Sequence, residues 1–141
     1  MAEYEHIDDV SIPNTDRLFR RVPPNQLSPN DDGTHRPSSS VFKHLEMSVN
    51  IESLMIEQER QPEDSLKDYP NEYLTSIIAG DVRSFGCYPI IKDNEPPKVN
   101  EVPKDLAHGL VLGKKKDSFA NKMVRGHKWI VQPPKASSVE K

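Results

Sequence analysis

Several residue types are scarce in this chain of 141 residues, and each scarcity excludes some classes of structure or function. Cys87 is the only cysteine, so no disulfide can form within the chain and cysteines alone cannot build a zinc site. No apolar run approaches the ~20 residues of a membrane-spanning helix. The acidic start lacks the basic and apolar segments of a signal peptide. We therefore expect a cytoplasmic protein without membrane contact.

Apolar residues are also scarce, at 34% of the chain, whereas 29% of the residues are charged and 13 are proline. Globular proteins usually contain about 45–50% apolar residues, so the sequence predicts a modest core with long surface connections. The length fits one domain. We expect a flexible acidic tail over 1–15, a single α+β domain over 16–134 and a second flexible tail over 135–141.

The net charge of −3 is unevenly distributed. Residues 104–128 hold seven Lys and Arg against two Asp, a net +5, whereas the start of the chain is acidic. The overall charge argues against a protein built to coat nucleic acid. Contact with nucleic acid through the turn Lys114–Lys116 stays open as an alternative.

The stretch 107–134 has the clearest pattern of secondary structure. An apolar run predicts a strand over 108–112, and a basic turn follows, whose lysines we expect to be exposed. Asp117 or Ser118 can cap a helix that continues to about Arg125. The helix gathers four apolar residues on one face, Phe119, Ala120, Met123 and Val124. A last strand follows over 128–132.

Earlier segments alternate short elements with proline-rich loops. Pro89 predicts an edge position or a bulge for the strand that contains it. The predicted strands cover 18–22, 40–43, 75–79 and 87–91; the predicted helices cover 51–60, capped by Asn50, and 82–85, capped by Asp81 and ended by Gly86; the long loops cover 23–37 and 93–103. Together these elements predict an α+β fold: a small mixed or antiparallel sheet with two or three short helices packed on one face.

The basic turn is the first candidate site. Gly113 and Lys114 precede a helix, but the spacing of a phosphate-binding P-loop fails because His108 and Lys115 stand where that motif needs glycine and Ser or Thr. A looser anion site stays open, because free backbone N–H groups at a helix N-terminus attract anions. Its candidate residues are Lys114, Lys115, Lys116 and Ser118. The alternative is a solvated basic turn, which is typical of charge runs.

The histidines lack the spacing of a metal site, and we expect neither a metal nor another cofactor. His127 follows the end of a predicted helix, where a cation is favoured, so a capping role is sufficient. His108 begins a strand, where it can transfer a proton or simply be half-buried.

Arg20 and the Ser-rich segment after it resemble the pattern of ADP-ribosyltransferases. In that family a strand arginine holds a phosphate of NAD and a serine supports the pocket. The resemblance implies a nucleotide- or NAD-handling enzyme whose candidate catalytic residues are Arg20, Ser38, Ser39 and His108. It covers only 18–42, and no Glu-x-Glu or Gln-x-Glu motif follows. A serine-rich loop beside arginines at a sheet edge accounts for the same residues.

Four segments also resemble a family of small bacterial proteins of unassigned role: 17–22 (RLFRRV), 36–43 (RPSSSVFK), 47–49 (MSV) and 107–114 (AHGLVLGK). This resemblance implies a compact α+β module and transfers no chemistry. The incomplete catalytic set, the long loops and the uneven charge favour a non-catalytic module that binds a protein partner. Its oligomeric state stays open.

Overall fold

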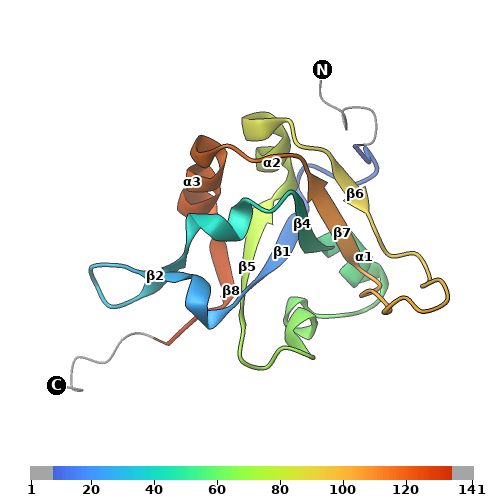
Figure 1. The fold of residues 1–141 in the computed structure, drawn as a ribbon, viewed down its shortest axis with the longest axis horizontal. Helices are drawn as coiled ribbons and strands as arrows, with labels where there is room; N and C mark the ends of the chain where they lie inside the picture. Colours follow the sequence, from blue (N-terminus) through green and yellow to red (C-terminus); the bar gives the residue numbers. More distant parts are fainter. Residues whose placement is uncertain (1–7, 135–141) are drawn as a thin grey trace.

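The computed structural model describes residues 8–134, and within them a six-stranded sheet forms the centre of the molecule (Figure 1). The strand order is β6-β7-β4-β1-β5-β8, and every neighbouring pair is antiparallel. The α+β class predicted from the sequence is confirmed. The strands of this sheet are β1 (Arg17–Val22), β4 (Glu46–Ile51), β5 (Tyr73–Ile78), β6 (Ile90–Lys92), β7 (His108–Leu112) and β8 (Lys128–Val131).

A separate hairpin and six helical segments complete the described part of the chain. The hairpin consists of β2 (Leu27–Pro29) and β3 (His35–Pro37). The α-helices are α1 (Glu52–Glu57), α2 (Ala79–Gly86) and α3 (Asp117–Gly126), and the 3-10 helices are η1 (Pro24–Gln26), η2 (Ser39–Phe42) and η3 (Pro62–Leu66). None of the helices among residues 8–134 is long and apolar enough to cross a membrane.

The two faces of the sheet carry different side chains, because successive residues of a strand point to opposite sides. Phe19 pairs with Asn50, and Asn50 pairs with His108, so these three side chains share one face, which we call the open face. Leu18, Arg20 and Val22 of β1 point to the other side, which we call the closed face.

The closed face is covered by η2, α2 and α3, and most of the core lies there. The α3 helix buries Phe119, Ala120 and Met123 as its apolar period predicts. The Phe119 ring meets the edge of Tyr88 at a centroid distance of 4.7 Å. Burial of such aromatic side chains is a main source of stability in a small domain.

The open face is covered only in part, by α1 and η3. Asn50 of β4 donates to Ser65 Oγ of η3 at 2.8 Å, and this hydroxyl in turn contacts the buried Met55 of α1. Helical segments therefore lie on both faces, and the prediction of helices on one face is wrong. The sequence analysis did not predict β4. The helix predicted over 51–60 begins after this strand, as α1.

Two early segments also differ from their prediction. Residues 40–42 belong to η2 and Lys43 follows its end, so no strand forms there; Ser38 Oγ accepts a hydrogen bond from Ser40 N and starts the helical turn. The loop predicted over 23–37 contains the β2–β3 hairpin. Asn50 is a strand residue rather than a helix cap, because its amide is buried against η3.

The chain from α2 into β6 makes a tight bend. Cys87, and not Gly86, adopts the left-handed conformation that ends α2, with φ of 56°. Gly86 is required for space instead, because a Cβ atom there would lie 2.2 Å from the Tyr88 ring. β6 lies at one edge of the sheet, as predicted from Pro89, but it covers Ile90–Lys92, so Pro89 precedes the strand and the predicted bounds of 87–91 are wrong.

Residues 8–15 are packed against this edge, so the prediction of a flexible tail over 1–15 is wrong for them. Asp9 N donates to Ile90 O at 2.8 Å, and Ile12 is buried. Arg83 of α2 fixes the segment by donating to the carbonyl oxygens of Asp9 and Ile12. The remainder of that predicted tail, 1–7, and the tail predicted over 135–141 lie outside the described residues.

Candidate functional site

Arg20 points into the closed face and acts there as a structural residue. Its guanidinium donates to Val41 O at 3.0 Å and to Ser48 O at 2.9 Å. Burial lowers its pKa to about 10, and the charge of Arg21 adds to this effect. These contacts join β1 to η2 and β4, so the guanidinium of Arg20 is occupied by the protein itself.

The other candidates of the NAD-type pocket lie apart. Ser38 caps η2, and Ser39 is the first residue of this turn. His108 belongs to the open face, on the other side of the sheet from Arg20. The structure therefore does not bring Arg20, Ser38, Ser39 and His108 together in one pocket.

Lys115 is buried, and the prediction of an exposed basic turn is wrong at this residue. Its side chain is only 5% exposed, and its ammonium donates to three backbone carbonyls, those of His44 (2.7 Å), Leu45 (3.2 Å) and Val111 (2.6 Å). Burial, and then the charge of Arg20, lower its pKa to about 8. Lys115 thus ties the turn to the chain before β4.

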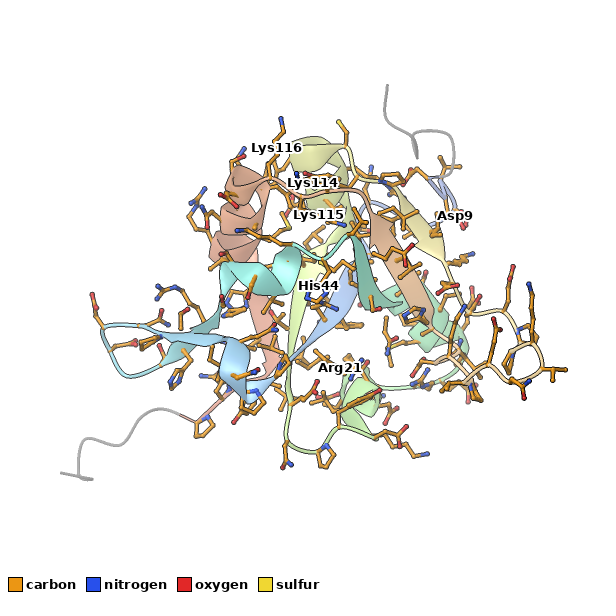
Figure 2. All side chains as sticks on the ribbon, viewed as in Figure 1. Asp9, Arg21, His44, Lys114, Lys115 and Lys116 are labelled. Atoms are coloured by element: carbon orange, nitrogen blue, oxygen red, sulfur yellow. The ribbon has the colours of Figure 1, made fainter. Side chains whose placement is uncertain are left out.

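The remaining anion-site candidates are exposed: Lys114 and Lys116 lie before the start of α3 (Figure 2), and Ser118 is in its first turn. The carboxylate of Asp117 lies at the same helix end and pairs with Lys43. The backbone N–H of Lys116 donates to Tyr88 Oη at 3.0 Å. A carboxylate repels an added anion, and one N–H is already bonded, so this helix end makes a poor anion site.

His127 follows α3 as predicted, but as a half-buried neutral side chain. Its Nδ1 lies 2.6 Å from Thr75 Oγ1, and its ring packs edge-on against Trp129. Burial, and next the charge of Lys128, lower the pKa of His127 to about 4. His127 is therefore uncharged near neutral pH, and it connects β5 to the start of β8.

The open face contains two adjoining cavities, which form one groove between η3 and residues 103–106. A cavity of about 200 Å³ lies over β1, β4 and β7, and a second cavity of about 630 Å³ continues from it along η3. Both are lined by Ser65, Tyr69, Pro103, Lys104 and Asp105. The first cavity also reaches Phe19, Arg21, Ser48, Val49, Asn50 and His108. We call this feature the groove.

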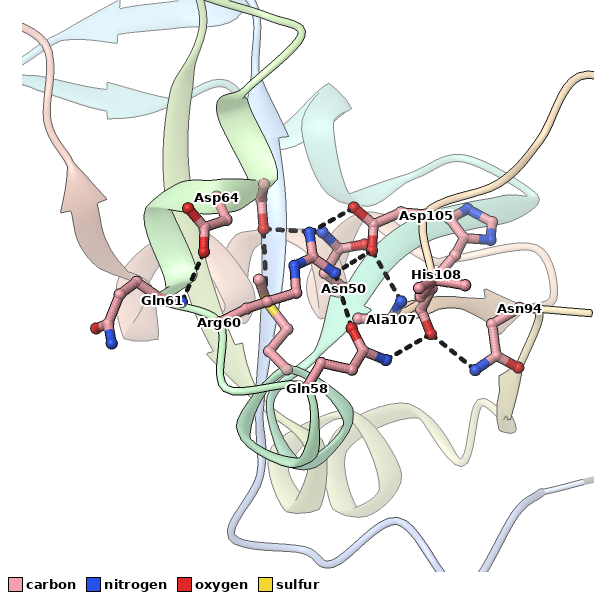
Figure 3. A network of polar contacts seen from close by, with 12 residues as sticks. Asn50, Gln58, Arg60, Gln61, Asp64, Asn94, Asp105, Ala107 and His108 are labelled. Carbon is pink, nitrogen blue, oxygen red and sulfur yellow. Dashed lines mark hydrogen bonds and ion pairs between the residues drawn. The ribbon is translucent and has the colours of Figure 1, made fainter.

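One side of the groove is held by a polar network (Figure 3). Arg60 donates to both carboxylate oxygens of Asp105, at 2.7 and 2.8 Å. The hydrogen bond from Arg60 holds the pKa of Asp105 below its usual value, and Ala107 N also donates to this carboxylate. Gln58 and Asn94 donate to Leu106 O. The segment 103–107 is therefore fixed in place.

Two cations border the smaller cavity. Arg21 stacks on the Tyr69 ring at 3.5 Å and has a loose ion pair with Glu72 at 3.6 Å. Lys104 pairs with Asp93 at 2.9 Å, and this pairing raises the pKa of Lys104. Asp93 also binds His108, whose Nδ1 lies 3.1 Å from its carboxylate and 3.0 Å from its carbonyl oxygen.

Three polar atoms in the lining of this cavity have no hydrogen-bond partner among residues 8–134. They are the hydroxyl of Ser48, the side-chain oxygen of Asn50 and Nε2 of His108. A hydroxyl both donates and accepts, whereas the role of Nε2 depends on the protonation of the ring. The lining can therefore form several directed hydrogen bonds with a polar ligand.

Large apolar side chains stand exposed beside the groove. Val99 is 90% exposed and Val102 is 83% exposed, both on the loop 93–107, which projects from the sheet (Figure 1). Leu106 is 64% exposed and lines the larger cavity. The groove is thus lined by polar groups, and large apolar side chains stand exposed along its border.

Among residues 8–134, no group of three or more His, Cys, Asp or Glu side chains could hold a metal ion. Comparison with protein-family models, curated proteins and solved structures gave no match to this chain. The geometry of the groove is therefore the basis for assigning a function.

Sequence analysis identified only His108 among the groove residues. Ser48, Asn50 and Val49 belong to β4, whose alternating Met47, Val49 and Ile51 are a strand signal that the analysis did not use. Arg21 and Lys104 carry no local signal, since charged residues are common in this chain.

Proposed function

We propose that the protein is a non-catalytic cytoplasmic module that binds a partner protein along the groove and the adjacent loop 93–107. The observation that carries this proposal is the exposure of Val99, Val102 and Leu106 on one loop. Soluble proteins rarely gather large apolar side chains at one exposed place, and such places commonly mark interaction sites.

The geometry of the loop supports this role. Its ends are fixed by the Asp93–Lys104 ion pair and by the Arg60–Asp105 contact. A loop whose ends are fixed loses less conformational entropy when it binds, which favours affinity. The groove beside it offers hydrogen-bonding groups, and a typical interface combines such groups with an apolar centre.

The test is capture of a partner by the full-length protein in a lysate of the cells that produce it, after chemical cross-linking. A double variant, Val99→Ser with Val102→Ser, removes the apolar groups from the loop. The matched control is Val10→Ser, because Val10 is 88% exposed but lies in the segment packed against β6. We expect the double variant to lose the partner and the control to retain it.

Two results would overturn the proposal. The first is a wild-type protein that stays monomeric and retains no specific protein. The second is a partner that the double variant captures as well as the wild type does. Thermal melts of all three proteins show whether a loss of binding reflects a loss of folding.

A further inference from the structure

We propose that the smaller cavity of the groove binds a carboxylate side chain, an Asp or Glu of the partner protein. This inference rests on the proposed function and assigns the chemistry of its central contact. Three features of the cavity support this assignment: the cations at its border, the compensated charge of its own carboxylate, and its unpartnered polar atoms.

The first step concerns charge. Arg21 and Lys104 both line the cavity, whereas Asp105 is its only acidic lining residue. Both oxygens of Asp105 already accept hydrogen bonds from Arg60, whose positive charge compensates the carboxylate. Arg21 and Lys104 are themselves paired with Glu72 and Asp93, so the charges around the cavity balance, and binding of an anion depends on the donors that these pairs leave free.

The second step concerns the present partners of the two cations. The contact of Arg21 with Glu72 is long for an ion pair, at 3.6 Å, and the guanidinium stacks on the Tyr69 ring. Stacking of this kind leaves N–H groups at the edge of the guanidinium free to bind a carboxylate. Lys104 can hold Asp93 and a second carboxylate together, since an ammonium has three donors.

The third step concerns the floor of the cavity. The Ser48 hydroxyl has no partner among the described residues and can donate to a carboxylate oxygen. Charge-assisted hydrogen bonds of this type are stronger than neutral ones. The volume of about 200 Å³ accommodates one acidic side chain, and the adjoining cavity of about 630 Å³ leaves room for the segment that carries it.

The experiment uses two blocked pentapeptides, in which either Glu or Gln is flanked by glycines, and free glutarate. Binding to the full-length protein is followed by the shifts of backbone amide signals in two-dimensional NMR. At roughly 10 mM, a site with millimolar affinity is nearly saturated. We expect the Glu peptide to shift the signals of Arg21, Ser48, Asn50 and His108, and to bind about tenfold more tightly than the Gln peptide.

Three variants sharpen the assignment. Arg21→Gln and Lys104→Gln each remove one cation, and we expect each to weaken the Glu peptide about five- to tenfold, a loss typical of a charged contact. Arg21 also stacks on Tyr69. If Arg21→Gln disturbs folding for this reason, Lys104→Gln still tests the carboxylate assignment. Lys114→Gln removes an exposed charge at the basic turn, well away from Arg21 (Figure 2), and should bind as the wild type does.

Several outcomes would overturn the assignment. These are equal binding of the Glu and Gln peptides, absence of shifts in the cavity, and equal loss in the Lys114→Gln control. Binding of glutarate as tight as that of the Glu peptide would assign the cavity to a small diacid instead. If the loop variant loses the captured partner while Arg21→Gln and Lys104→Gln retain it, the protein-binding function stands and the carboxylate assignment fails.

Discussion

The two faces of the sheet use polar residues in opposite ways. On the closed face, Arg20 and Lys115 are buried cations whose donors bind backbone carbonyls of neighbouring segments. On the open face, Arg21 and Lys104 border a cavity in which further polar atoms have no partner within the described chain. A cluster of positive residues in the sequence therefore does not by itself mark a binding site. What matters is whether the protein itself already satisfies the donors.

Substitutions on the two faces should therefore differ in whether they change stability or binding. Changes to the buried residues of the closed face should lower the free energy of unfolding, whereas changes to the unpartnered polar groups of the groove should alter binding and leave stability nearly intact. Substitutions of Phe119, Lys115, His127 and Ser48 test this division.

Phe119→Ala should have the largest effect on stability. Phe119 is 2% exposed and packs against Tyr88, which also accepts a hydrogen bond from Lys116 N. Emptying such a site typically costs about 3–5 kcal/mol. Chemical denaturation should show a large loss, and at a total stability of about 5–15 kcal/mol the variant can unfold. A midpoint like that of the wild type would contradict the closed-face core.

Lys115→Ala should lower the free energy of unfolding by about 2–3 kcal/mol. Each buried carbonyl left without a donor costs about 1–3 kcal/mol, and water replaces some of the lost hydrogen bonds. Lys115→Met, which keeps the volume but has no donor, should also be destabilised. Lys114→Ala is the control and should change the value by less than about 0.5 kcal/mol. Equal stability of the Lys114 and Lys115 variants would show that the buried ammonium contributes nothing.

His127 should make the protein sensitive to acid. Its pKa falls from 6.5 to about 4 on folding, so between these values the unfolded chain binds a proton that the folded chain does not. Stability is therefore lost as the pH falls from about 6.5 to 4, by at most about 3 kcal/mol. His127→Gln should lose less stability than the wild type over this range in parallel denaturation series. Identical pH dependence of the two proteins would exclude this role for His127.

Ser48→Ala should have the smallest effect on stability and still reduce binding. No partner of the Ser48 hydroxyl exists among residues 8–134, so its removal should change the free energy of unfolding by less than about 0.5 kcal/mol. If the hydroxyl donates to a bound carboxylate, the Glu peptide should bind about two- to tenfold more weakly. NMR titration and denaturation of the same sample measure both effects. A large loss of stability with unchanged peptide binding would reverse the comparison between the faces.

The sequence predicted the elements whose patterns are local. The apolar period of α3 and the apolar run of β7 suffice to identify them, and the proline before β6 indicated an edge strand. The groove could not be predicted in this way, because its lining comes from β1, β4, β7, η3 and the loop 93–107. Which strands become neighbours depends on pairings between distant segments, such as Phe19 with Asn50 and Asn50 with His108.

The burial of Lys115 shows the same limit. Lysine is normally exposed, and the neighbouring Lys114 and Lys116 follow this rule. The ammonium of Lys115 is buried because the carbonyls of His44 and Leu45, far away in the sequence, lie within reach of it. No local pattern distinguishes the middle lysine of the three.

The position of β1 in the middle of the sheet has a consequence for how the chain folds. Among residues 8–134, β1 is synthesised before the other strands, yet both of its neighbours, β4 and β5, come much later in the chain. Proteins dominated by such distant contacts fold slowly, on the order of milliseconds to seconds. Until its neighbours arrive, β1 exposes Leu18, Phe19 and Val22. We expect the charges of Arg17, Arg20 and Arg21 to oppose aggregation of this segment during that interval, as gatekeeper residues do.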